Sequence, residues 1–145
     1  MVAGIKHLKL TPKLEKLIHV RCAAHIINLA VQMGLKVEEI SKLIKKLRYV
    51  CNKCHCGAAI AQQLKRSQSH HKEPEIKVVM DVETRWNSTY DMISQALRIP
   101  KSLTDILDST QSKKSEYENF EKTDWDNYND INLFLEPFNQ GMICF

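Results

Sequence analysis

The stretch LKVEEISKLIKKLRYV, residues 35–50, gives the clearest indication of how this chain folds. Its apolar residues recur every three or four positions, which is the spacing of one face of an α-helix. That face comprises Leu35, Val37, Ile40, Leu43, Ile44, Leu47 and Val50. Four cations fall mostly on the other face: Lys42, Lys45, Lys46 and Arg48. We expect an amphipathic helix whose basic face is either simply solvated or binds phosphate.

Helical patterns continue on both sides of this stretch. Upstream, apolar residues cover most of the circumference of a helix from about Cys22 to Met33. This pattern predicts a buried helix, with Gly34 at the position just past its C-terminal end. Downstream, residues 51–67 can continue as helix, and Gly57 is the weak point of that segment.

One short run in the second half of the chain has a different pattern. The β-branched residues of IKVVM, residues 76–80, predict a strand. A helix is expected from about Asn87, with an interruption at Pro100, and a last helix from Thr123 that Pro137 closes. The predicted fold class is therefore α/β, predominantly helical with one clear strand. An isolated strand cannot pair its backbone. Its partner is therefore either residues 17–20 or another part of the N-terminus, or, as we expect, strands that belong to sequence outside this chain.

Length and charge restrict the kind of protein further. The chain has 145 residues, enough for one modest domain, and no apolar run of membrane-spanning length or signal-peptide pattern. We therefore expect an intracellular protein without a membrane partner. Residues 1–72 hold 14 Lys and Arg against 3 Asp and Glu, whereas residues 73–145 hold 7 against 14. The two halves carry +11 and −7, so the basic half can attract either phosphate or the acidic half.

The cysteines suggest a metal site but have a simpler interpretation. Cys51, Cys54 and Cys56 lie within six residues, together with a histidine, which raises the hypothesis of a zinc-binding interaction module. However, adjacent residues of a helix point in different directions, whereas a tetrahedral site needs a turn between its ligand pairs. Buried, reduced thiols are the simpler interpretation.

Two other groups of residues have the minimum that catalysis requires. Cys22 and His25 are one helical turn apart and could touch, as a thiol nucleophile and its base must. A histidine within the core is the alternative, and it would need a hydrogen-bond partner. Asp81, directly after the predicted strand, could bind Mg²⁺ in a nuclease or could simply serve the turn into the next helix.

The pair Arg85-Trp86 follows in the segment DVETRWNSTY, residues 81–90. Arginine binds phosphate with two parallel hydrogen bonds and tryptophan offers a face on which a base can stack, so the pair could hold an unpaired nucleotide. Alternatively, Trp86 anchors the following helix in the core and Arg85 neutralises a nearby carboxylate. The residue types alone leave both interpretations open.

Several blocks of this sequence, taken together, resemble one family. They are RCAAHIINLAV at residues 21–31, the helix over residues 44–50, DVETRWNSTY at residues 81–90, and Trp125 with FLEPF at residues 134–138. Their order and spacing are similar to those in the central region of hAT-superfamily transposases. Relatives of that type include zinc finger BED domain proteins and RICESLEEPER-type domesticated transposases.

The resemblance implies an RNase H-like fold of which only the central part is present. Residues 17–107 would be a partial transposase core, and residues 108–145 a polar loop and the truncated start of a helical insertion. Residues 1–16 match nothing that can be assigned. The family's metal-binding acidic triad would lie outside this chain, so we expect no catalytic residue, no metal ligand, no cofactor and no enzyme activity, although the full-length family uses a divalent metal.

The resemblance also suggests what the chain does. Cys22 and His25 would lie near the family's active site, and Arg85-Trp86 would correspond to the pair that handles DNA flanking the cleaved end. We therefore expect a domesticated transposase fragment that is nuclear and has DNA as its partner, bound by Arg85, Trp86 and the cations of residues 42–48. Homodimerisation is known for the family, but its C-terminal dimerisation region is expected to be absent here.

Overall fold

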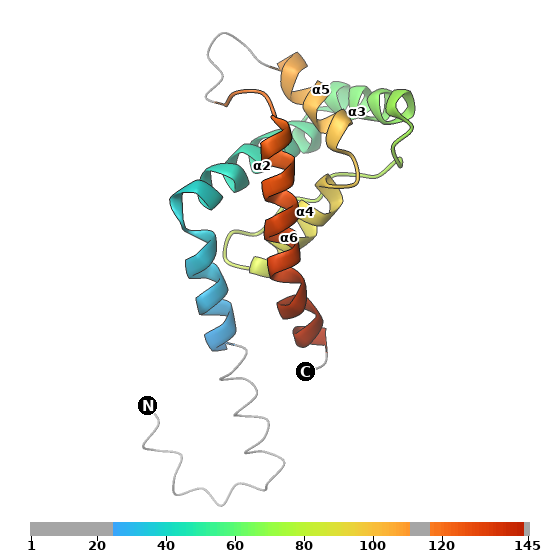
Figure 1. The fold of residues 1–145 in the computed structure, drawn as a ribbon. Coiled ribbons are helices and arrows are strands. Elements are labelled where there is room, and N and C mark those ends of the chain that lie inside the picture. Colours follow the sequence, from blue (N-terminus) through green and yellow to red (C-terminus); the bar gives the residue numbers. More distant parts are fainter. Residues whose placement is uncertain (1–24, 111–116, 144–145) are drawn as a thin grey trace, which may run out of the picture.

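The computed structural model describes residues 25–110 and 117–143, and within those ranges the regular structure is helical (Figure 1). A helix covers residues 25–35. The elements that follow are α2 (Glu38–Cys56), α3 (Ala58–His71), α4 (Trp86–Ala96), α5 (Pro100–Thr110) and α6 (Lys122–Ile143). The helix α2 crosses the molecule (Figure 1). Beyond its C-terminal end α3 packs on α5, and α4 packs on α6.

The amphipathic helix predicted from residues 35–50 is confirmed as α2. It buries Ile44, Leu47, Val50, Cys51 and Cys54 on one face. Its first turn holds Glu38 and Glu39, whose negative charges stabilise the helix because they lie at the positive end of the helix dipole. Gly57, in an extended conformation, separates α2 from α3, as expected of the weak point in this segment.

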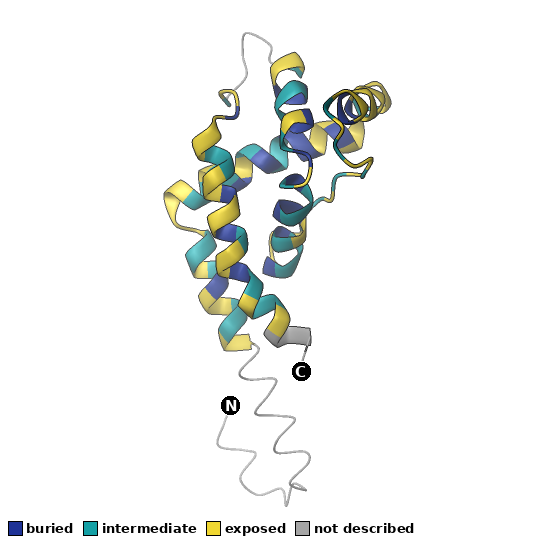
Figure 2. Cartoon of the chain, turned by 45° about the vertical axis from the view of Figure 1, so that its right-hand side comes forward, coloured by how far each residue is buried: buried dark blue, intermediate teal, exposed yellow. Residues whose placement is uncertain are grey.

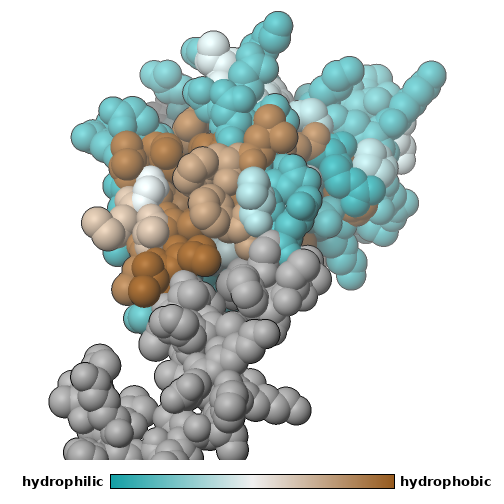
Figure 3. Space-filling view, turned by 60° about the horizontal axis from the view of Figure 1, so that its bottom comes forward, coloured by the Kyte–Doolittle hydropathy of each residue, from teal (hydrophilic) through white to brown (hydrophobic). Residues whose placement is uncertain are grey.

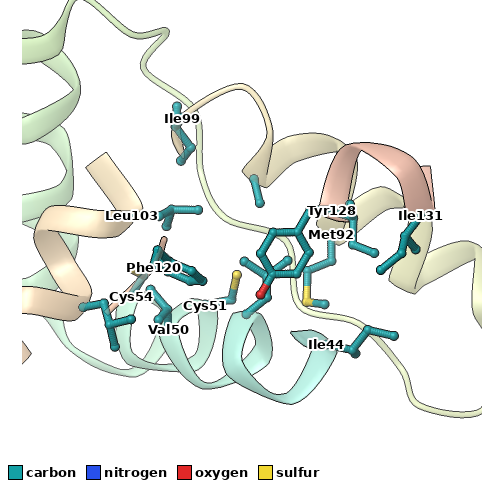
Figure 4. Packing of buried hydrophobic residues seen from close by; sticks show 14 of the residues in the cluster. Ile44, Val50, Cys51, Cys54, Met92, Ile99, Leu103, Phe120, Tyr128 and Ile131 are labelled. Atoms are coloured by element: carbon teal, nitrogen blue, oxygen red, sulfur yellow. The ribbon is translucent and has the colours of Figure 1, made fainter. Parts of the chain in front are cut away.

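A single apolar core joins α2, α4, α5 and α6. Figure 2 shows the buried residues on the inward sides of these helices, and Figure 4 shows how they meet. At its centre the Tyr128 ring of α6 lies against α2, and its hydroxyl donates a hydrogen bond to the Leu43 carbonyl at 2.7 Å. The fully buried side chains include Leu47, Trp86, Met92, Ile93, Ile99, Leu103, Ile106, Leu107, Tyr128 and Leu135.

Polar side chains hold α5 against α3. The carboxylate of Glu73 accepts hydrogen bonds from the backbone N–H groups of Lys101 and Ser102, each at 3.0 Å, in the first turn of α5. An anion at this position satisfies free backbone donors and complements the helix dipole. One turn further along α5, Asp105 accepts hydrogen bonds from Ser67 and His71 of α3. The predicted interruption at Pro100 is confirmed, since α5 begins at that residue.

The strand predicted at residues 76–80 is wrong, and the described residues contain no strand. The segment is extended, with Ile76, Val78 and Met80 half-buried and Lys77 and Val79 exposed, which explains the alternating sequence pattern. A strand, however, also needs a paired neighbour. Here the Ile76 carbonyl instead accepts a hydrogen bond at 2.9 Å from the buried side chain of Gln68. The described part of the chain is therefore all-α rather than α/β.

The helix over residues 25–35 also differs from its prediction. We expected it to be buried on all sides, but Ile26, Leu29 and Met33 are 64%, 50% and 73% exposed. Val31 is buried on the opposite side, so the helix has one covered face and one apolar face that no described residue covers (Figure 3). Gly34 lies inside the helix rather than beyond its end.

The sequence suggested that Pro137 closes the last helix. In the structure α6 instead continues through Pro137 to Ile143. Proline removes one helical hydrogen bond, which frees the carbonyl of Leu133 four residues earlier. Both Leu133 and Pro137 are exposed, so water can satisfy that carbonyl at little cost. None of the helices in the described ranges is long and apolar enough to cross a membrane.

Candidate nucleic-acid interface

A cluster of charged and polar side chains connects α2, the extended segment before α4, and α4 itself. Arg48 of α2 donates from Nε to Asp81 Oδ1 at 2.7 Å and from Nη2 to Asp81 Oδ2 at 2.6 Å. Thr89 of α4 adds a hydrogen bond from Oγ1 to Asp81 Oδ2 at 3.0 Å. The Asp81 side chain is fully covered, whereas that of Arg48 is 27% exposed. This cluster fixes the extended segment before α4 against α2.

The environment of Asp81 keeps it ionised. Burial alone raises the pKa of this carboxyl group, but the hydrogen bonds and positive charge of Arg48, with the Thr89 hydroxyl, outweigh burial and hold the pKa below its usual value. Both carboxylate oxygens are thus used within the protein. This geometry favours the structural interpretation of Asp81 over the magnesium hypothesis.

Besides Arg48, two lysines of α2 have acidic partners among the described residues. Lys46 donates to Asp124 Oδ2 at 2.6 Å and to the Asn119 carbonyl at 2.8 Å, and its ammonium lies 5.0 Å from the centre of the Phe120 ring. Its side chain is only 13% exposed, so Lys46 ties α2 to the start of α6. Lys42 is exposed and pairs with Glu38 at 2.7 Å along the same helix.

Arg85 and Trp86 are adjacent in sequence, but Arg85 is exposed and Trp86 is buried. Trp86 is 1% exposed and contacts the Phe138 ring edge to face, with the ring centres 6.4 Å apart. It therefore anchors α4 in the core, and stacking on a base would require it to leave that site. Arg85 is exposed directly before α4 and makes no ion pair with any described residue.

Ser88 organises the turn that carries Arg85, a role that the sequence reasoning missed. Its hydroxyl donates to the Arg85 carbonyl at 2.6 Å and lies 3.0 Å from the Val82 carbonyl, and it accepts from the Val82 N–H at 2.8 Å. The Ser88 side chain thus reaches back to the turn that precedes α4. Serine commonly makes such local bonds to the backbone.

Two adjacent pockets lie along α2. The first, which we call the Gln32 pocket, is lined by Gln32, Leu35, Lys36, Ser41, Ile44, Lys45, Arg48, Glu83 and Thr89. The second, the Tyr49 pocket, is lined by Lys45, Arg48, Tyr49, Asn52, Met80 and Tyr117. Lys45 and Arg48 border both. Lys45 is exposed and makes no ion pair with a described residue, and Lys36 is a further exposed cation that the sequence reasoning did not select.

The cysteine cluster does not converge on one point. Cys51 and Cys54 are buried in the core, and burial raises the pKa of Cys51 to about 12 and that of Cys54 to about 11. Cys56 is exposed and its thiol donates to Asn52 Oδ1 at 3.2 Å. No group of three or more His, Cys, Asp or Glu side chains within residues 25–110 and 117–143 could hold a metal ion. The thiols in this cluster therefore have the geometry of structural cysteines rather than of zinc ligands.

The two residues expected near the family's active site are not both described. Cys22 lies outside the described residues. His25 is exposed at the start of the described helix, so it does not occupy the core position that the sequence suggested.

Comparison with known proteins places this geometry in context. The sequence model of the ZBED1 RNase-like helical domain matches residues 20–134. The chain is also 38% identical over 80 residues to a putative AC transposase and to a putative AC9 transposase of Zea mays. Each match covers 54% of this chain but only 10% and 9% of the two maize proteins, so this chain corresponds to about a tenth of them. No solved structure matches significantly.

Proposed function

Because this chain belongs to the family of the ZBED1 RNase-like helical domain, we propose that it is a transposase-derived helical module that binds the phosphate backbone of DNA and does not cut it. One observation carries the proposal. The helix α2 presents Lys45, which no described acid neutralises, between two pockets that it shares with Arg48. Exposed cations around such concave surfaces are the features that attract a phosphate backbone.

The cations differ in how available they are. Lys45, Lys36 and Arg85 are exposed and make no ion pair with a described residue. Lys42 would have to leave Glu38, an exposed pair that costs little to break. Arg48 and Lys46 contribute their charge from fixed positions. Trp86 stays in the core, so the proposed binding depends on charge rather than on base stacking.

The absence of cleavage is supported by the state of Asp81. A metal-dependent nuclease needs carboxylates that converge on its ions. Asp81 instead gives both oxygens to Arg48 and Thr89. The family resemblance also puts the acidic triad outside these residues. We infer a nuclear setting from the relationship to transposases.

Salt dependence of DNA binding tests this proposal. If Lys36, Lys42, Lys45 and Arg85 each contact a phosphate, the logarithm of the binding constant should fall with the logarithm of salt concentration with a slope of about −3.6. Affinity would then drop by about 150-fold between ~50 and ~200 mM salt. We would measure it by fluorescence anisotropy of a labelled duplex of arbitrary sequence.

Two lysine variants provide a matched comparison. Lys45→Ala should weaken binding and reduce the magnitude of the salt slope by about 0.9. Lys65→Ala removes the same charge from α3, where Lys65 is exposed and paired with Glu75 at 2.8 Å, and should leave both quantities unchanged. Equal effects of the two substitutions would mean that only net charge matters and would remove α2 as the interface.

A further inference from the structure

The Gln32 pocket contains a polar group whose hydrogen-bonding capacity is unused. The Nε2 atom of Gln32 is shielded from solvent and has no hydrogen-bond partner among the described residues. A buried N–H donor without an acceptor is unfavourable, so such a donor in a pocket indicates that an acceptor from outside belongs there. Gln32 lines this pocket from the helix over residues 25–35, and Ile44, Lys45 and Arg48 line it from α2.

The other lining groups indicate the charge of that acceptor. Lys36 and Lys45 bring two ammonium groups that no described acid pairs, and Ser41 brings a hydroxyl. Arg48 has its Nε and Nη2 bound to Asp81, while its Nη1 is 3.9 Å from Glu83 Oε1, too far for a hydrogen bond. The pocket thus combines several N–H donors with an excess of positive charge.

The acidic groups nearby do not cancel this charge. Asp81 is covered and committed to Arg48. Glu83 lines the pocket, but its side chain is 84% exposed and forms no hydrogen bond with a described residue. It can turn into solvent when an anion enters. A tetrahedral oxyanion could accept hydrogen bonds from the amide and the ammonium groups at once, whereas a halide offers a single centre.

We propose that the Gln32 pocket binds one phosphate group, with Gln32 Nε2 and the ammonium groups of Lys36 and Lys45 as its donors. This inference deepens the proposed function. It rests on that function only where it identifies the bound phosphate as part of the DNA backbone. The binding of the phosphate group itself is argued from the pocket alone.

The test is a titration of the whole chain with inorganic phosphate. Its readout is the ¹H–¹⁵N NMR spectrum, recorded at a constant ionic strength that is set with chloride. The side-chain amide signals of Gln32 should shift and saturate at millimolar phosphate, together with the backbone signals of nearby residues. Signals from the far end of α3 should not move. Shifts that are spread over the molecule and do not saturate would overturn the proposal.

Three substitutions should change phosphate binding, not all in the same direction, and a fourth serves as the control. Gln32→Met keeps the length of the side chain without its N–H group, and Lys36→Ala removes one charge; each should weaken phosphate binding at least fivefold. Glu83→Gln removes the opposing charge and should tighten binding about two- to fivefold. Lys53→Ala, an exposed lysine of α2 outside this pocket, should have no effect. Weakening by Lys53→Ala equal to that by Lys36→Ala would refute a specific site.

A parallel anisotropy titration with duplex DNA separates this inference from the proposed function. Saturable phosphate binding without DNA binding would support the pocket and refute its link to DNA. DNA binding that is unchanged by Gln32→Met, together with no saturable phosphate binding, would refute the pocket and leave the proposed DNA interface standing. The circular dichroism spectrum of each variant should match that of the parent chain. If a variant fails this check, Glu83→Gln is used in its place, because unfolding could not produce the tighter phosphate binding that is expected of it.

Discussion

Substitutions of the two partners in the Arg48–Asp81 pair should destabilise the fold to different extents. Asp81 is fully covered, and without Arg48 its charge would lose two of the three hydrogen bonds that it accepts from side chains. Leaving a buried charge unpaired costs about 3–5 kcal/mol, so Arg48→Met should lower the free energy of unfolding by about that amount. Asp81→Asn leaves Arg48 unpaired instead, but that side chain is 27% exposed and water can reach it, so we expect only about 1–3 kcal/mol.

The double variant measures the interaction itself. Because neither variant leaves its partner satisfied, Arg48→Met with Asp81→Asn should cost less than the sum of the two single changes, by about 1–3 kcal/mol. Urea unfolding followed by circular dichroism at pH 7 gives all four free energies, and urea, unlike guanidinium, does not screen charges. Single changes of equal cost, or costs that simply add, would refute the assignment of Asp81 as a buried, paired anion.

The pH dependence has a defined sign. The pKa of Asp81 is lower in the folded protein than its value of about 3.9 in an unfolded chain. Its ionised form therefore stabilises the fold above pH ~4, and that stabilisation is lost as the pH falls through the folded-state pKa. The difference in stability between the parent chain and Asp81→Asn should be constant from pH 6 to pH 7 and shrink below pH 4.

Three other predictions concern the core and its helix ends. Trp86→Ala should lower the free energy of unfolding by about 3–5 kcal/mol, measured by urea unfolding, because the ring is fully buried; Trp86→Phe should cost less. Iodoacetamide at pH 8 should label Cys56 rapidly, but Cys51 and Cys54 only after unfolding, because burial raises the pKa of both thiols; peptide mass spectrometry assigns the sites. Glu73→Ala should cost about 1–2 kcal/mol in thermal unfolding, since it removes the acceptor for the first turn of α5, and an unchanged midpoint would contradict this role.

Local periodicity predicted the elements whose partners lie within the described residues. The helix α2 is recognisable because its apolar stripe lies in the core, where α3 and α5 pack against it. The breaks at Gly57 and Pro100 follow from backbone chemistry. The same reasoning failed at residues 76–80. Side-chain alternation there reported burial on one side correctly, but it carried no information about whether a neighbouring strand exists.

The candidate site was harder to predict than the helices because a cation's role depends on distant acids. Of the basic residues on α2, Lys46 meets Asp124 and Arg48 meets Asp81, 78 and 33 residues away in sequence. No local pattern distinguishes these lysines and arginines from Lys45, which stays unpaired by any described acid. For Trp86, the sequence gives only the two alternatives, and its burial in the structure favours the anchor.

The opposite charges of the two halves explain how these roles are divided. The pairs formed by Lys46, Arg48, Lys65 and His71 all join the basic first half to an acid beyond residue 72. Part of the basic excess is therefore used within the fold, and the cations left over on α2 and before it are those proposed to meet phosphate. Salt should weaken both kinds of contact unequally, because the Arg48–Asp81 pair is largely shielded whereas Lys36 and Lys45 are exposed. A steep loss of DNA affinity between ~50 and ~200 mM salt, with the helical circular dichroism signal unchanged, would therefore report lost phosphate contacts and not a loosened core.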